Sequence, residues 1–374
     1  MLDILDKIRK PSIFILLLIL NLRFLFTVVF DDRQEVLSLL TILFFFLSLD
    51  YQGIRREYLC WILLFVGISL ADFTPYKLNI LTPLILMQCL SRFSLRTYLQ
   101  YNIIILGGTA IVMFLMFGTG HMIIGTGVDL VRIRYDFGFG HPNTVTIYYW
   151  GLFMSILLYV YISRYRNLLW WIGGILLVIS IYLYSETISR TFIMAVIIFI
   201  LVLGYYTIRS RFKENYRIGY SRYVWYLLPL LLTIATIFFA INVNDYPKLD
   251  ILFSRRLTFY KQLLDGLSPL QYLLGTTAFS DIIIDNSYLH LLFEAGIFLF
   301  IYFIWLYFFA IKNIIRQQNF VVIAIFISFL VYGLMESLLL FGVIIGNNLF
   351  WVLLYRYRHD EDEELSPVDG KLVN

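Results

Sequence analysis

Charged residues are scarce in this chain of 374 residues: Asp, Glu, Lys and Arg make up 14% of it, against 60% hydrophobic residues. Cysteine is scarcer still, with only Cys60 and Cys89, and both lie inside apolar runs. That placement indicates two buried thiols and excludes a disulfide framework or a cysteine-based metal site.

Several chemical motifs are also missing. The sequence has no GxxxxGK[ST] phosphate loop, which argues against cytosolic nucleotide hydrolysis. It has no HExxH, no CxxC, and no paired-Asp motif in its outer loops that resembles a divalent-metal nucleotide-sugar site, so we expect neither a metal ion nor another cofactor. The basic residues are dispersed along the chain, which argues against nucleic-acid binding.

Long apolar runs dominate what is present. The mean hydropathy is +0.81, and most runs approach the ~20 residues that a helix needs to cross a ~30 Å bilayer core. The alternating pattern of an outer-membrane barrel is absent. We therefore predict an all-α, polytopic membrane bundle that forms a single domain over 1–374, with about 12 transmembrane helices. The predicted spans are 12–30, 36–49, 57–73, 76–91, 101–117, 144–162, 168–184, 191–208, 223–241, 286–310, 320–338 and 341–355.

The distribution of Lys and Arg predicts the orientation. With the N-terminus inside, the inner connections hold 19 of the 29 Lys and Arg residues. The opposite orientation would place the basic connection 209–222 outside, against the positive-inside rule. We expect both termini to be cytoplasmic, including an acidic, solvated C-terminal tail at 356–374.

Two outer connections, 118–143 and 242–285, are long, and loops of that length are usually functional or disordered. They hold most of the outer cations: Arg132, Arg134, Lys248, Arg255, Arg256 and Lys261. In the second loop, apolar residues recur at helical spacing and predict a short amphipathic helix. Ser254 is its expected N-cap, and Gly266 marks its end.

The first loop ends in RIRYDFGFGHPN, residues 132–143. Arg132 and Arg134 lie two residues apart, so in an extended segment both could bind one pyrophosphate. They could equally reach lipid headgroups. His141 could act as a base, an acid or a hydrogen-bond donor, and Asn143 is a further substrate-binding candidate.

More candidates lie on the same predicted face. Arg190 follows Glu186 in a tight turn, where it could close a local ion pair or supply a third cation. Arg255 and Arg256 fall in the first turn of the amphipathic helix, facing lipid headgroups or a lipid-borne phosphate.

The tenth predicted span begins with a polar stripe. Asp285 stands at its mouth, which suits a general base for a sugar hydroxyl. Asn286, His290 and Glu294 follow at intervals of four, so one helix face carries all three. Glu294 is either functional or paired with a basic side chain such as Arg23.

Three segments together resemble a known family: RIRYDFGFGHPN (132–143), FSRRLTFYKQLLDGLSPLQYLLG (253–275) and DNSYLHLLFEAGIFLF (285–300). The chain resembles the Wzy-type polymerases of bacterial surface-polysaccharide repeat units and, more distantly, the O-antigen ligases. The segments cover under a fifth of the chain, while the arrangement of spans and outer loops is similar throughout.

The resemblance implies a metal-independent glycosyltransferase with a GT-C-like fold in the bacterial cytoplasmic membrane, serving capsule, exopolysaccharide or O-antigen synthesis. Its donor would be an oligosaccharide on undecaprenyl pyrophosphate, and a flippase and a chain-length regulator would be partners. The pyrophosphate-binding arginines would be Arg255 and Arg256, and less directly Arg132, Arg134 and Arg190.

The ligases have a histidine where this chain has Asp285, which argues against a ligase. The resemblance leaves the base open between Asp285, His141 and neither. The main competing interpretation is a flippase or other transporter of the same lipid-linked sugars, although transporters usually place their polar residues at the middle of the membrane and show related halves.

Overall fold

The computed structural model describes residues 2–26, 35–50, 75–90, 93–119, 127–129, 132–163, 165–212, 221–276, 284–339 and 344–358. The expected span 57–73 and nearly all of the expected tail lie outside the described residues.

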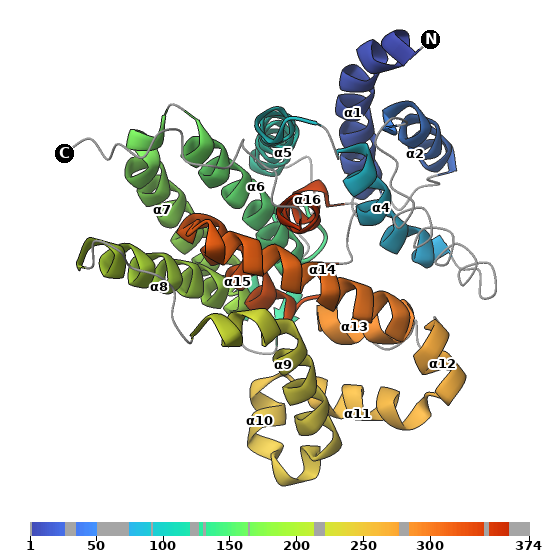
Figure 1. The fold of residues 1–374 in the computed structure, drawn as a ribbon. Coiled ribbons are helices and arrows are strands. Elements are labelled where there is room, and N and C mark those ends of the chain that lie inside the picture. The colour runs from blue at the N-terminus through green and yellow to red at the C-terminus, as the bar shows by residue number, and fades with distance from the viewer. Residues whose placement is uncertain are drawn as a thin grey trace.

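Helices account for nearly all of the described structure (Figure 1). Six of them are long and apolar enough to cross a membrane, which gives the chain the make-up of a multi-pass membrane protein. These are α5 (Leu95–Gly118), α6 (Pro142–Ile162), α7 (Leu169–Thr187), α8 (Arg190–Phe212), α9 (Ser221–Ile241) and α14 (Gly296–Arg316). The helical class is confirmed, while the count of twelve spans and the GT-C-like arrangement stay predictions.

The remaining apolar helices are shorter or begin in polar sequence. They are α1 (Leu2–Leu25), α2 (Glu35–Ser48), α4 (Pro75–Cys89), α15 (Phe320–Gly333) and α16 (Asn348–Tyr357). Helix α16 lies inside the bundle, packed against α14 and α4 (Figure 1), and all ten of its residues are buried. In contrast, α7 exposes Trp170, Trp171 and Val178. A helix with this apolar outer surface suits contact with lipid.

The last two predicted spans are shorter than expected. Helix α15 ends at Gly333, before the predicted end at 338, and a turn carries the chain to Glu336. Helix α16 has ten residues and follows the 3₁₀ turn Ile345–Asn347. In the described part of 341–355, this 3₁₀ turn and α16 stand in place of the single helix expected, and the crossing of the membrane by this segment stays a prediction.

The predicted span 286–310 is also not one helix. It divides into α13 (Ser287–Glu294) and α14, with a break at Gly296, whose φ is +81°. The last turn of α12 (Pro269–Leu274) packs against this break, so closely that a Cβ on Gly296 would lie 2.6 Å from the Leu273 carbonyl oxygen. Only glycine fits both the left-handed backbone and the close approach.

The second long loop folds into short helices beside α9 and α13 (Figure 1). After a 3₁₀ turn at Val243–Asp245 come α10 (Pro247–Leu252), α11 (Arg256–Gly266) and α12. The predicted amphipathic helix is α11, and its end at Gly266 is confirmed.

The start of α11 differs from the prediction. Ser254 is not its N-cap, because the helix begins at Arg256 and Arg255 occupies the N-cap position. Ser254 and Arg255 both have left-handed backbone conformations, with φ values of +56° and +62°. The capping function passes to Asp250 of α10, whose carboxylate accepts from the Thr258 backbone N–H at 3.1 Å and from its hydroxyl at 2.6 Å. This side-chain acceptor replaces the missing N-cap.

The described end of the first long loop is a short hairpin, the exception to the all-helical class among the described residues. Strands β1 (Gly127–Asp129) and β2 (Arg132–Arg134) pair antiparallel, with Asp129 opposite Arg132. The chain then joins the α7–α8 turn, where the Tyr135 N–H donates to the Glu186 carbonyl at 3.0 Å. This contact holds the segment that leads into α6 against the end of α7.

Candidate functional site

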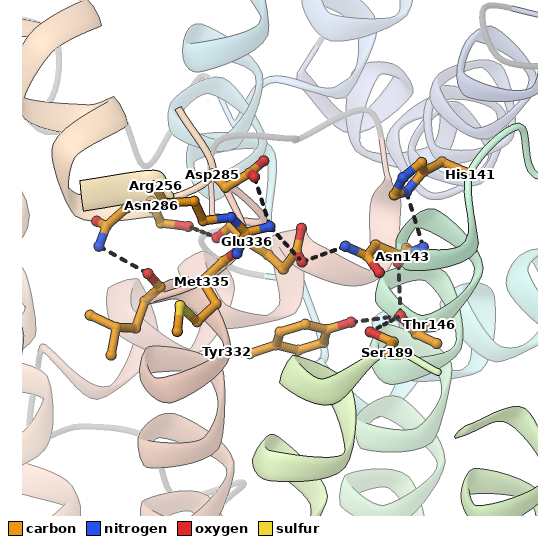
Figure 2. Close-up of polar contacts among 12 residues, drawn as sticks. His141, Asn143, Thr146, Ser189, Arg256, Asp285, Asn286, Tyr332, Met335 and Glu336 are labelled. Atoms are coloured by element: carbon orange, nitrogen blue, oxygen red, sulfur yellow. Dashed lines mark hydrogen bonds and ion pairs between the residues drawn. The ribbon is translucent and has the colours of Figure 1, made fainter. Parts of the chain in front are cut away.

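Five segments that are far apart in the sequence bring polar side chains together at or near helix ends, and Figure 2 labels all members of this cluster except Arg134. The cluster consists of Arg134 from β2, His141 and Asn143 at the start of α6, Arg256 at the start of α11, Asp285 just before α13, and Glu336 after α15. We call it the outer polar cluster, because the distribution of Lys and Arg predicts that the two long loops lie on the outer face of the membrane.

Arg256 is the centre of the outer polar cluster. Its Nη2 atom lies 2.7 Å from the Asp285 carboxylate and 3.7 Å from Oε1 of Glu336. Its Nη1 atom donates to the carbonyl of Met335. One guanidinium thus joins α11, the start of α13 and the segment after α15, using the fixed fork of donors that arginine provides.

Asn143 connects this centre to Arg134. Its amide nitrogen donates to Oε1 of Glu336 at 2.7 Å, and its amide oxygen accepts from Arg134 at 2.9 Å. The Nε atom of Arg134 donates to the Thr187 carbonyl at 2.7 Å. A continuous chain of polar contacts therefore runs from the α7–α8 turn through both long loops to Asp285.

His141 is the N-cap of α6, where its Nδ1 atom accepts from the backbone N–H of Asn143 at 3.1 Å. Desolvation in the partly enclosed site and the nearby Arg134 guanidinium lower the pKa of His141. A neutral imidazole that accepts at Nδ1 carries its proton on Nε2. His141 can therefore donate a hydrogen bond toward the cluster through Nε2.

Buried hydroxyl groups fix the base of the cluster. The Thr146 hydroxyl donates to the Asn143 carbonyl at 2.8 Å and lies 2.9 Å from the Tyr332 hydroxyl and 3.3 Å from that of Ser189 (Figure 2). These contacts join the first turn of α6 to α15 and α8. They hold Asn143 in place while Glu336 and Arg134 bind its amide.

Other predicted site residues lie apart from the cluster. Arg190, at the start of α8, and Arg255 are exposed, and neither side chain makes a hydrogen bond or ion pair with any described residue. The backbone of Arg132 is in β2, opposite Asp129.

Asn286 and Glu294 have local partners. Asn286 is buried and caps α13 by accepting from the N–H groups of Tyr288 and Leu289 at 2.9 and 3.0 Å. The carboxylate of Glu294 lies 2.7 Å from Nε2 of His290, so its partner is the next residue of the same stripe and not Arg23.

Glu336 is the member of the cluster that sequence reasoning missed. It is 5% exposed, and burial raises the pKa of its carboxyl to about 8, against the lowering effect of Arg256. The signal was available: Glu336 is a single acidic residue in the apolar stretch LVYGLMESLLLFG, and a carboxylate in such a stretch is a functional candidate.

A cavity of about 180 Å³ adjoins the cluster on the α9 side. Its walls come from α9, α10, α11 and the segment after α15, and Arg256 and Asn286 are among the few polar residues on it. The apolar part of the lining includes Leu232, Phe239, Leu249, Phe253, Leu257 and Tyr260. An apolar chamber with a guanidinium in its wall suits a ligand that has both an apolar chain and an anionic group.

No protein-family model, curated protein or solved structure matches the chain. Among the described residues, no group of three or more His, Cys, Asp or Glu side chains could hold a metal ion. The outer polar cluster and the cavity beside it are therefore the features of the chain that bear on its function.

Proposed function

We propose that the protein polymerises lipid-linked oligosaccharide repeat units at the outer face of a bacterial cytoplasmic membrane. It transfers the saccharide from an undecaprenyl-pyrophosphate donor to an acceptor repeat unit that is also lipid-linked. The observation that carries the proposal is the position of Arg256, which belongs both to the outer polar cluster and to the wall of the apolar cavity.

The chemistry of the donor fits this pair of features. Its pyrophosphate is anionic and its polyprenyl tail is apolar, so a guanidinium beside an apolar chamber addresses both parts. The cavity is smaller than the roughly 300–1,000 Å³ of ordinary ligand sites. The cavity would hold the part of the polyprenyl tail next to the phosphate, and the remainder of the tail would lie against the exposed apolar helices.

Positive charge would also assist the reaction. As the anomeric carbon–oxygen bond breaks, negative charge develops on the departing pyrophosphate, and positioned cations stabilise it. Arg256 and Arg134 lie on either side of Glu336 and Asn143, so a pyrophosphate entering the site can exchange with the carboxylates now bound to Arg256. Outside the cytosol, a pre-activated lipid donor replaces the nucleotide sugar.

The location of the cluster favours an enzyme over a transporter. Every member lies at a helix end or in a connection: Arg134 in β2, His141 and Asn143 at the start of α6, Arg256 at the start of α11, Asp285 before α13 and Glu336 after α15. Transporters usually hold their substrate near the middle of the membrane. A flippase and an O-antigen-type ligase are the alternative functions, and in vivo products separate the three.

The test compares neighbouring basic residues in the native host, with the amount of membrane-inserted protein matched. Arg256→Ala should reduce polymer synthesis roughly 100-fold, because losing one donor to a developing charge typically costs that much. Lys248→Ala, at an exposed position in the same loop, should leave it unchanged. Arg255→Ala should have a much smaller effect than Arg256→Ala, since the Arg255 side chain is exposed and makes no hydrogen bond or ion pair with the cluster.

The intermediates distinguish the functions. A polymerase defect leaves single repeat units on lipid at the outer leaflet, without long polymer. Accumulation at the inner leaflet would contradict the proposal and favour a flippase. Polymer of normal length that fails to attach to its final acceptor would favour a ligase.

A further inference from the structure

The backbone on both sides of Glu336 is firmly held. Its N–H donates to the Tyr332 carbonyl at 3.1 Å, and its carbonyl accepts from the Ser287 hydroxyl at 2.6 Å. The same hydroxyl accepts from the Leu339 N–H at 3.2 Å. The segment after α15 is thereby attached to the first turn of α13, so the Glu336 side chain projects from a fixed base.

The two carboxylate oxygens of Glu336 differ in their surroundings. Oε1 accepts from Asn143 at 2.7 Å and faces Arg256 at 3.7 Å. Oε2 accepts no hydrogen bond from the described residues, and Figure 2 shows it turned to the side on which Asp285 and His141 lie. The anchored oxygen fixes the carboxylate, and the second is free to meet a substrate hydroxyl.

The two bases expected from the sequence are less suitable. Asp285 is in a direct ion pair with Arg256 at 2.7 Å through Oδ2, and protonation of its carboxylate would weaken that ion pair. His141 uses Nδ1 to cap α6, so its Nε2 carries a proton and can donate but not accept. Of the two carboxylates, Glu336 lies farther from the guanidinium, at 3.7 Å against 2.7 Å, and is the more buried, so its Oε2 is the better placed acceptor.

We infer that Glu336 is the general base that takes the proton from the acceptor sugar's hydroxyl group, an assignment that rests on the proposed polymerase function. The hydroxyl oxygen attacks the anomeric carbon of the donor and forms the new glycosidic bond. The bond between that carbon and the phosphate oxygen breaks, and its electron pair leaves with the pyrophosphate. The hydroxyl proton passes to Oε2 of Glu336.

The electrostatics of the site agree with this role. A general base works best when its pKa is near the working pH, and burial raises the pKa of Glu336 to about 8. Glu336 takes up a proton below that value, so the rate should rise with pH and level off above about 8. The charged and titratable groups around it are Arg256 and Tyr260 of α11, Asp285, Arg134, His141 and Tyr332.

The test measures initial rates of elongation by the full-length protein in lipid vesicles. The substrate is lipid-linked repeat units extracted from a host strain that lacks the protein. The pH runs from about 6 to about 9.5, a range that brackets the expected rise of the rate with pH. Wild type should show a rising limb with an apparent pKa near 8. Glu336→Gln should lower kcat by roughly 100-fold or more, with little change in KM for the donor, and should lose the limb. Glu336→Asp should keep a limb at a reduced rate.

Contrary outcomes separate the two proposals. If wild type elongates the units and Glu336→Gln keeps the wild-type limb, Glu336 is not the base and the polymerase function stands. Loss of the limb in Asp285→Asn or His141→Gln, with Glu336→Gln unaffected, would assign the base to one of those residues. If wild type elongates nothing, the polymerase proposal fails, and this inference fails with it.

Discussion

Replacing Glu336 by Gln should stabilise the folded protein while it sharply lowers activity. Burial favours the protonated carboxyl in the folded state, so its pKa stands at about 8 there, against an ordinary value of 4.5. Between these two values the folded chain binds the proton more tightly than the unfolded chain. Stability therefore falls as the pH rises from 4.5 to about 8, and it falls no further above that.

The magnitude at neutral pH follows from this interval. pH 7 lies about 2.5 pH units above the ordinary value, and each unit corresponds to about 1.4 kcal/mol, so wild type loses about 3 kcal/mol. Gln has nearly the same shape and does not ionise, so Glu336→Gln avoids this loss. Its melting temperature should exceed that of wild type by several degrees at pH 7, and the difference should shrink toward pH 4.5.

Thermal unfolding of the purified protein in detergent micelles, recorded across the pH range, measures this difference. Glu186→Gln is the control, because that side chain makes no hydrogen bond or ion pair with any described residue, and its melting temperature should match wild type. A Glu336→Gln variant that melts below wild type at every pH would refute the reasoning. The ion pair with Arg256 would then outweigh the cost of burying the carboxylate.

Three further substitutions, two of them paired with a comparison variant, test other parts of the structure. Gly296→Ala should abolish the folded, monodisperse protein in size-exclusion chromatography, because the new Cβ would lie 2.6 Å from a backbone oxygen at the end of α12. Gly108→Ala, with nothing within 4 Å in α5, should be tolerated and gain up to about 1 kcal/mol. Asn286→Ala should lower stability to thermal unfolding by about 1–2 kcal/mol through loss of the α13 cap, and Asn286→Ser should recover part of it. Arg134→Lys should shorten the polymer seen on gels, because a lysine replaces the two separate donors that bind Asn143 and the Thr187 carbonyl with one ammonium group and holds the site less firmly.

The sequence predicts the helical class well because apolar run length depends on local composition alone. The long runs that become α5 to α9 are found within one or two helical turns of their observed bounds. Candidate residues in three separate segments also come together: Arg134, His141 and Asn143 meet Arg256 and Asp285. Charge in an apolar chain is costly, so the few positions that carry it are informative from the sequence alone.

What the sequence misses depends on tertiary contacts. Arg255 and Arg256 are equivalent in sequence, and only the left-handed turn at Ser254 and Arg255 decides which guanidinium enters the cluster. The break at Gly296 escapes notice because a glycine inside a helix costs only about 1 kcal/mol. Its close approach to α12 is visible only after the fold brings the two segments together.

The line of contacts from Thr187 through Arg134, Asn143, Glu336 and Arg256 to Asp285 has a consequence for engineering and for evolution. Each of these side chains has its partner on another segment, so their substitution energies should be strongly non-additive. A chimaera that receives one outer loop from a different protein would replace one partner of every contact that joins this loop to the rest of the line, such as Asn143 with Glu336 or Arg256 with Glu336. Specificity in this protein should therefore transfer only when both loops and the segment after α15 are exchanged as one unit.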